Sequence, residues 1–216
     1  MASTSIEATE LFVRTIAEVA IRNEKYFADL DGVCGDGDFG ISLATGFSKV
    51  MQQWPPLDRA TPGAVLKSVS MTIASCVGGV SGAIWGTAFL RASLSAGART
   101  DLTTDDVVAM LMAAAEGIKK RGNSDVGDKT LLDALIPMTD AIAEALAADG
   151  EPRSGKDVAE IAATRARESA EATTSMQAMR GRASYTGERS IGSPDAGAMA
   201  VALMAERVAQ DWPDSS

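Results

Sequence analysis

Apolar residues recur at helical spacing along most of the chain, and this periodicity constrains the fold more than any other feature. In the first segment, Phe12, Ile16 and Val19 are three or four residues apart, which places them on one face of a helix. Stretches of alternating β-branched residues, which predict strands, are hard to find. The pattern predicts eight helices, over residues 6–30, 40–54, 61–77, 83–96, 103–118, 129–148, 154–179 and from 193 onward.

Capping residues and short connections support this division. Thr61 precedes Pro62, the residue type favoured at the first helical position. Two pairs approximate capping boxes, Thr103 with Asp106 and Ser154 with Asp157. Because each helix must bury its apolar stripe against the others, the predicted class is all-α, an up-and-down antiparallel bundle or closed helical barrel. No composition shift or linker marks a boundary, so residues 1–216 are predicted to form a single domain.

Composition narrows the function. A net charge of −9 argues against a surface that binds nucleic acid. No apolar run approaches the ~18–20 residues of a membrane span, and the N-terminus lacks a signal-peptide pattern. Cys34 and Cys76 are expected to be reduced thiols, so we expect a cytoplasmic protein that does not bind membranes. The absence of histidine excludes histidine-based acid–base catalysis, phosphohistidine chemistry on this chain and the usual zinc sites.

The stretch from Leu30 to Ser42 contains three carboxylates separated by glycines, directly before a helical pattern. The glycines predict a tight loop with positive φ angles, in which Asp31, Asp36 and Asp38 can converge. Converging carboxylates repel one another unless a cation lies between them, and a hard divalent ion prefers oxygen ligands. The helix that follows offers N–H groups that suit a phosphate. The stretch therefore indicates a Mg²⁺–nucleotide site, although Asp-Gly repeats also occur in plain turns.

Three other connections carry similar chemistry. Residues 78–82 are rich in glycine and contain Ser81, which suits phosphate but also an ordinary helix–helix turn. Residues 121–130 resemble a P-loop but have Asp128 inserted before Lys129 and no preceding strand, so Asp128 or Thr130 is expected to cap a helix instead. Residues 181–197 form a long loop whose arginines suit phosphate oxygens or solvent. In an up-and-down bundle, these three connections and the aspartate loop lie on the same rim.

The motifs resemble those of a known family, the nucleotide-binding subunit L of dihydroxyacetone kinases, also called the DhaL or DAK2-type domain. The resemblance runs from the first predicted helix to the last. The matching residues are Leu30-Asp31, Gly35 to Gly40, Gly46 to Val50, Val77 to Gly82, Gly86-Thr87, Gly127 to Thr130, Asp133, Met176 to Ala178, Gly181 to Tyr185, Gly187 to Gly192, Asp195 and Gly197.

The resemblance implies a closed barrel of eight antiparallel helices with a nucleotide across one rim. It implies that Asp31, Asp36 and Asp38 hold a pair of Mg²⁺ ions and that Arg182 adds positive charge at the phosphates, these four residues being the catalytic ones. The residues expected to contact the nucleotide are Phe39, Gly40, Ile41, Ser42, Val80, Ser81, Gly122, Leu131, Arg182, Asp195, Ala196 and Gly197. Phe39 stands where many bacterial subunits have histidine, and Pro194-Asp195 departs from the commoner Asp-Pro order.

The family resemblance also implies a reaction. The chain would bind ADP or ATP with Mg²⁺ and transfer a phosphoryl group to a short keto-sugar held covalently by a histidine of a separate K subunit. The phosphoryl donor is either ATP or a protein of the phosphotransferase system that recharges bound ADP. A nucleotide-loaded regulatory module without turnover is the alternative, followed by a metal-binding structural protein. The sugar is dihydroxyacetone or another keto-triose or keto-tetrose.

Overall fold

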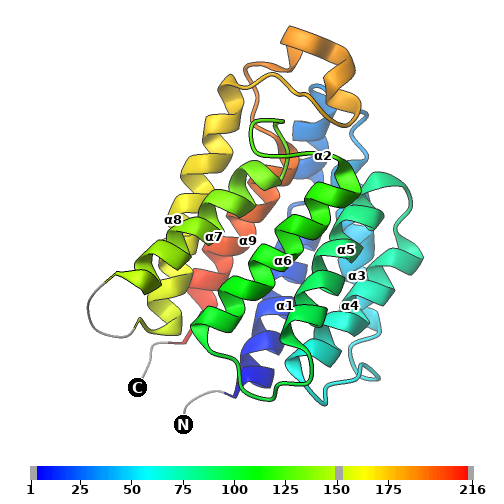
Figure 1. The fold of residues 1–216 in the computed structure, drawn as a ribbon. Coiled ribbons are helices and arrows are strands. Elements are labelled where there is room, and N and C mark those ends of the chain that lie inside the picture. Colours follow the sequence, from blue (N-terminus) through cyan, green and yellow to red (C-terminus); the bar gives the residue numbers. More distant parts are fainter. Residues whose placement is uncertain (1–3, 149–152, 214–216) are drawn as a thin grey trace.

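The computed structural model describes residues 4–148 and 153–213 (Figure 1). Within these ranges the chain is all-helical and has no strand, as the sequence predicted. The α-helices are α1 (Ser5–Arg22), α2 (Glu24–Gly32), α3 (Phe39–Gln52), α4 (Pro62–Cys76), α5 (Gly79–Ala96), α6 (Thr104–Gly122), α7 (Leu132–Ala147), α8 (Gly155–Ala172) and α9 (Ala196–Asp211). Two 3₁₀ helices, η1 (Thr173–Ser175) and η2 (Arg182–Ser190), lie between α8 and α9.

Helices that follow one another in the chain are also neighbours in space. From α3 to α9 each helix packs against the next, α9 also packs against α1, and α1 packs against α3. The core between them is apolar and includes the fully buried Phe27, Phe47 and Leu132. The Phe47 ring meets Trp85 and Phe89 edge-on, with centroids 6.2 and 6.0 Å apart. Each such side chain contributes about 1.5–3 kcal/mol by burial, which fixes the helices that carry the loops.

Three of the predicted caps are confirmed, at Thr61, Thr103 and Ser154. Thr61 accepts a hydrogen bond from the Ala64 N–H, with Pro62 at the first position of α4. Both predicted capping boxes form, at the start of α6 and at the start of α8. These contacts depend on residues three apart in sequence, which is why the sequence alone locates them.

Several predicted bounds were wrong. The first predicted helix is divided at Asn23, whose side chain donates to the Val19 carbonyl, 2.8 Å away, so α1 ends and α2 begins there. The second begins at Phe39 and ends at Gln52 rather than Trp54. The predicted break at residues 78–82 is present but shorter, because α4 ends at Cys76 and α5 already begins at Gly79. Helix α6 extends past residue 118 to Gly122 and ends on the left-handed Asn123.

Three later helices also have bounds that differ from the predicted ones. The sixth predicted helix begins at Leu132 instead of Lys129, with Leu131 at its N-cap. The Thr130 hydroxyl accepts a bond from the Leu132 N–H, 3.2 Å away, as expected for a residue that caps the helix, whereas the Asp128 carboxylate accepts from the Asp125 N–H instead. Helix α8 ends at Ala172, seven residues before the predicted end at 179. The last helix begins at Ala196, and its N-cap is Asp195 instead of Ser193.

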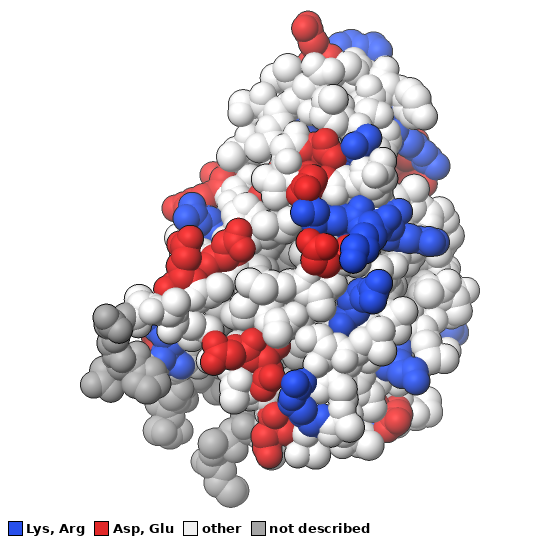
Figure 2. Space-filling view, viewed as in Figure 1, with Lys and Arg blue, Asp and Glu red and all other residues white. Residues whose placement is uncertain are grey.

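The connections α2–α3, α4–α5, α6–α7 and α8–α9 all lie at the end of the bundle opposite the start of α1 (Figure 1). We call this end the loop rim. On the face shown in Figure 2, acidic side chains gather over α7 and α8, and basic ones over α6. None of the described helices combines the length and apolar character that crossing a membrane requires.

Candidate nucleotide–metal site

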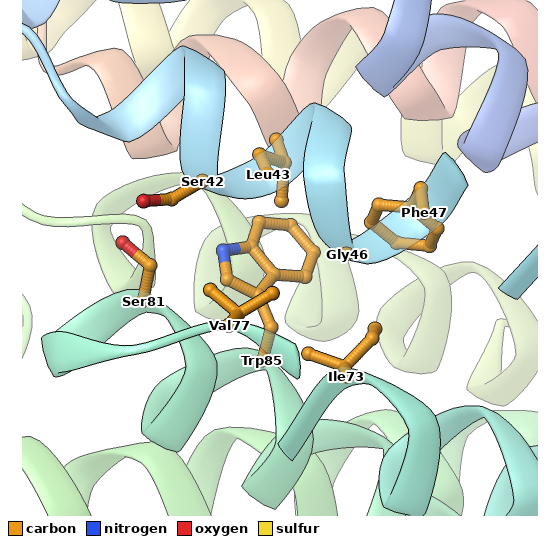
Figure 3. A pocket seen from close by; sticks show the side chains of 8 residues that line it. All are labelled: Ser42, Leu43, Gly46, Phe47, Ile73, Val77, Ser81 and Trp85. Carbon is orange, nitrogen blue, oxygen red and sulfur yellow. The ribbon is translucent and has the colours of Figure 1, made fainter. Parts of the chain in front are cut away.

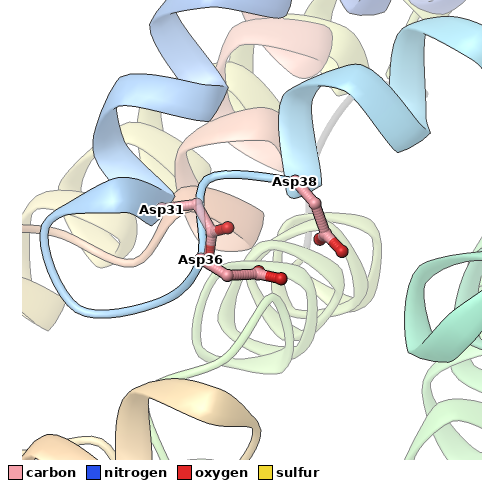
Figure 4. A group of neighbouring side chains, drawn as sticks. All are labelled: Asp31, Asp36 and Asp38. Carbon is pink, nitrogen blue, oxygen red and sulfur yellow. The ribbon is translucent and has the colours of Figure 1, made fainter.

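Three aspartates from the α2–α3 region converge at the loop rim (Figure 4). Asp31 lies in the last turn of α2, Asp36 in the connection, and Asp38 at the N-cap of α3. One carboxylate oxygen from each lies within 4.8 Å of the others, and all three residues are at least partly exposed. The convergence that the sequence predicted is therefore present.

The glycines of this loop act in two different ways. Gly37 has a φ of +75°, a conformation that glycine adopts without strain. Gly35 has no positive φ, but a Cβ there would overlap the Asp31 carboxylate and lie 2.9 Å from the Asp31 carbonyl oxygen. The Gly35 N–H also donates to that carbonyl, 2.5 Å away. The chain thus turns back on Asp31, which brings Asp36 beside it.

The first turn of α3 follows the aspartates directly. The Phe39 N–H donates to Oδ2 of Asp31 over 3.4 Å, which ties the helix start to the cluster. The Phe39 ring packs edge-on against buried Phe27, with centroids 6.1 Å apart, while Ile41 is exposed. The N-terminus of α3, with its partial positive charge, is therefore held beside the three carboxylates.

Arg182, from η2, faces the same aspartates. Its guanidinium contacts Asp36 and lies 3.2 Å from Asp38 Oδ2. The cluster thus attracts positive charge from a segment far away in sequence. Three carboxylates of this kind are hard oxygen donors, which fit Mg²⁺ and do not favour softer metals. The residues that the sequence proposed as metal ligands therefore fit such an ion.

A small recess lies between the start of α3 and the start of α5. Its lining residues include Ser42, Ser81 and Trp85. Figure 3 shows the two hydroxyl groups pointing toward each other, with the indole nitrogen of Trp85 on the same side. Val80, the neighbour of Ser81, is 71% exposed at the rim. Most of the lining is apolar, so the recess exposes little polar surface, and the sequence did not identify Trp85 as part of it.

The remaining predicted contacts lie on two other parts of the rim. Gly122, at the end of α6, faces α5, where an added Cβ would lie 3.3 Å from Ile84. Leu131, at the N-cap of α7, lies beside Gly197. A Cβ added to Gly197 would lie 3.2 Å from the Cβ of Leu131. Asp195 caps α9 by accepting a bond from the Ala198 N–H, 2.7 Å away. Ala196 is buried behind this cap. Contact of these residues with a nucleotide stays a prediction.

Sequence reasoning also missed the role of Lys129. Its side chain is buried, and its ammonium donates to three carbonyls of the α8–α9 connection. Its φ of +61° is uncommon for a residue with a side chain. The sequence Gly-Asp-Lys indicates a loop, but none of the neighbouring residues indicates which distant carbonyls the lysine will contact.

The carboxylate of Asp195 gives the protein a pH dependence. Desolvation raises its pKa from 3.8 to about 7, against the opposing effect of the Ala198 N–H bond. Between pH 3.8 and about pH 7, the Asp195 carboxyl group keeps its proton in the folded chain and has lost it in the unfolded chain. We therefore expect the free energy of unfolding, with metal and nucleotide removed, to fall as pH rises from 4 toward 7, by up to about 1.4 kcal/mol per pH unit.

The matched variant is Asp195→Asn, which keeps an oxygen for the α9 cap but does not titrate. Urea denaturation of both proteins between pH 4.5 and 8.5 measures the difference. The wild type should lose stability relative to the variant up to about pH 7, and no further above it. Parallel curves across this range would contradict the assignment.

Comparison with known proteins places the chain in a family. The model of the DAK2 domain matches residues 33–210. The PEP-dependent dihydroxyacetone kinase ADP-binding subunit DhaL of Escherichia coli K12 is 40% identical over 86% of this chain and 87% of its own length. The PTS-dependent dihydroxyacetone kinase ADP-binding subunit DhaL of Lactococcus lactis is 35% identical over 94% of this chain and 95% of its own.

A solved structure has the same fold. The dihydroxyacetone kinase from C. freundii, in complex with AMP-PNP and Mg²⁺, superposes with a TM-score of 0.66 at 21% identity. The match covers 95% of this chain but only 33% of that longer protein. The solved structure bears on the fold alone, while the family model and the relatives show that this chain belongs to the DAK2 domain family.

Proposed function

We propose that this chain is the nucleotide-binding subunit of a dihydroxyacetone-type kinase. It would bind ADP or ATP with Mg²⁺ at the loop rim and take part in phosphoryl transfer to a short keto-sugar. The observation that carries the proposal is the convergence of Asp31, Asp36 and Asp38 beside the start of α3, opposite Arg182. The names of the E. coli and L. lactis relatives, both ADP-binding subunits of such kinases, support it.

Within this proposal the aspartates hold a pair of Mg²⁺ ions, which when bound neutralise phosphate charge. The first turn of α3, Phe39 to Ser42, would contact phosphate oxygens, as helix N-termini do. The donors would be the N–H groups of Gly40 and Ile41, because those of Phe39 and Ser42 already donate to Asp31 and Asp38. Val80 and Ser81 line the phosphates from α5. Arg182 moves from the carboxylates to a phosphate oxygen, where a guanidinium can donate two bonds.

The rest of the nucleotide would contact the other loops of the rim. We propose Gly122, Leu131, Asp195, Ala196 and Gly197 as these contacts. The packing of Gly197 against Leu131 supports their placement in one subsite. We also propose that residues 1–216 form one domain and that its helices form a closed barrel. The packing of α9 against α1 and of α1 against α3 supports closure.

Phosphoryl transfer depends on positioning and charge neutralisation more than on protein nucleophiles. The chain has no histidine with which to hold a keto-sugar covalently. We therefore propose a separate K-type subunit that carries the sugar on a histidine, in the cytoplasm. Because the relatives are PEP- and PTS-dependent, we propose a phosphotransferase-system protein as the donor that recharges bound ADP.

Reconstitution tests this function. The chain is mixed with a K-type subunit and dihydroxyacetone, together with either ATP or a phosphorylated phosphotransferase-system protein, and sugar phosphate is measured. We expect product only with both subunits and with the phosphorylated protein as donor, and erythrulose in place of dihydroxyacetone tests the sugar. Tight nucleotide binding without transfer under any of these conditions would favour the regulatory alternative.

A further inference from the structure

Lys129 is the one lysine among the buried charged residues of the described chain, and it lies in the α6–α7 connection at the loop rim. Only 6% of the residue is exposed. Burial lowers the pKa of its ammonium, although the charges of Cys34 and Asp195 act in the opposite direction. A buried ammonium costs free energy unless its donors are satisfied, so its partners explain how it can be held there.

The three partners are backbone carbonyls of one segment. Nζ of Lys129 donates to Met176 at 3.0 Å, to Ser190 at 2.5 Å and to Ser193 at 2.7 Å. An ammonium has three N–H donors, so each finds one acceptor. All three acceptors lie in the connection between η1 and α9, and none lies on the helices beside Lys129.

These contacts tie the two ends of a loop to one point. Residues 177–189, which we call the arginine loop, begin after Met176 and end before Ser190. The ends are also bonded to each other, since the Ala178 N–H donates to Oγ of Ser190 over 2.8 Å. The middle of the loop carries Arg182, which faces the aspartate cluster.

The residue before Lys129 holds the same loop. The Asp128 carbonyl accepts a bond from the Met179 N–H at 3.0 Å, and its carboxylate pairs with Arg180 at 3.0 Å. The turn that carries Lys129 therefore contacts the arginine loop at Met179 and Arg180, just before Arg182 in sequence, as well as at both ends. The side chain of Arg182 itself is 61% exposed, so apart from its contacts with Asp36 and Asp38 its placement depends on the backbone that carries it.

We propose that Lys129 is a positioning residue that sets the placement of Arg182 over the aspartate cluster by anchoring both ends of the arginine loop. The inference rests on the proposed function, in which Arg182 contacts the nucleotide phosphates. Lys129 does not itself touch the nucleotide. Its effect on nucleotide affinity therefore requires Arg182, whereas its effect on the loop backbone does not.

A double-mutant cycle separates positioning from a general structural role. The dissociation constant for ADP with excess Mg²⁺ is measured for wild type, Lys129→Met, Arg182→Gln and the double variant. We expect Lys129→Met to weaken binding on the order of 10-fold, and by less than about 2-fold in the Arg182→Gln background. An equal loss in both backgrounds would overturn the inference.

The matched control is Lys156→Met. Lys156 also donates from Nζ to a carbonyl, that of Ala209 at 2.6 Å, but it joins α8 to α9 away from the loop rim. We expect this variant to bind ADP as the wild type does. A loss equal to that of Lys129→Met would mean that any contact of a lysine with a backbone carbonyl has the same effect, and it would overturn the inference.

Limited trypsin digestion tests the anchor without nucleotide, because the arginine loop contains cleavable arginines. Cleavage there should be faster in Lys129→Met than in wild type or Lys156→Met, and an unchanged rate would overturn the inference. If Lys129→Met does not fold, Lys129→Arg replaces it in both assays, since a planar guanidinium cannot meet three carbonyls placed around an ammonium. A wild type that binds no nucleotide would reject the proposed function, while digestion would still decide the anchor.

Discussion

Replacement of Asp36 by Asn is expected to weaken ADP binding in the presence of Mg²⁺ by at least about 100-fold, since even residues behind a metal ligand change affinity by 10–100-fold. Asp36 supplies a carboxylate to the cluster with Asp31 and Asp38. An amide has a similar shape but no charge, so the loss would arise from weaker metal binding. Titration calorimetry with ADP at fixed excess Mg²⁺ measures the change.

Asp29→Asn is the matched control for this variant. Asp29 is an exposed aspartate of the same helix as Asp31, but it pairs with Lys25 one turn earlier and lies outside the cluster. An exposed pair of this kind contributes little to stability. We expect Asp29→Asn to bind Mg²⁺–ADP like the wild type. Equal affinity in both variants would show that the cluster is not the metal site.

The largest effect on stability is expected for Gly40→Ala. A Cβ at Gly40 would overlap the carbonyl oxygen of Glu24 and lie 2.6 Å from the Ala28 nitrogen, both backbone atoms of α2. Backbone atoms cannot move away as side chains do, so α2 and α3 must separate. Overpacking of this kind costs typically 1–3 kcal/mol and occasionally more, so we expect a loss of about 3 kcal/mol.

Thermal denaturation followed by circular dichroism measures this loss, which should lower Tm by roughly 6–12 °C in a chain of this size. Gly32→Ala is the control, because a Cβ at Gly32 would meet nothing closer than the Gly37 Cα, 3.9 Å away. That substitution should change stability by less than about 1 kcal/mol. Similar Tm values for the two variants would contradict the close packing of α2 on α3.

The sequence predicted those features that depend on neighbouring residues. The helical class follows from apolar spacing, and the capping boxes at Thr103 and Ser154 follow from pairs three residues apart. The aspartate cluster was predicted because a short glycine-rich loop leaves few other arrangements for its carboxylates. In each case the physical cause lies within a few residues of its effect.

The features that the sequence did not predict depend on distant partners. The end of α8 could not be placed, because the Thr173 hydroxyl that follows it accepts a bond from the Asp195 N–H, 22 residues away. The start of α7 was missed because Lys129 adopts a left-handed conformation and reaches across to Ser190. The pairing of Arg182 with Asp36 likewise spans most of the chain.

The central claim is that the aspartate cluster holds Mg²⁺ and a nucleotide together. Native mass spectrometry of the purified chain, before and after dialysis against EDTA, tests it most directly. We predict a species with the mass of the chain plus ADP and Mg²⁺, lost on chelation and absent from Asp36→Asn. A chain that carries no nucleotide, and that binds neither ADP nor ATP when these are added with Mg²⁺, would contradict the claim.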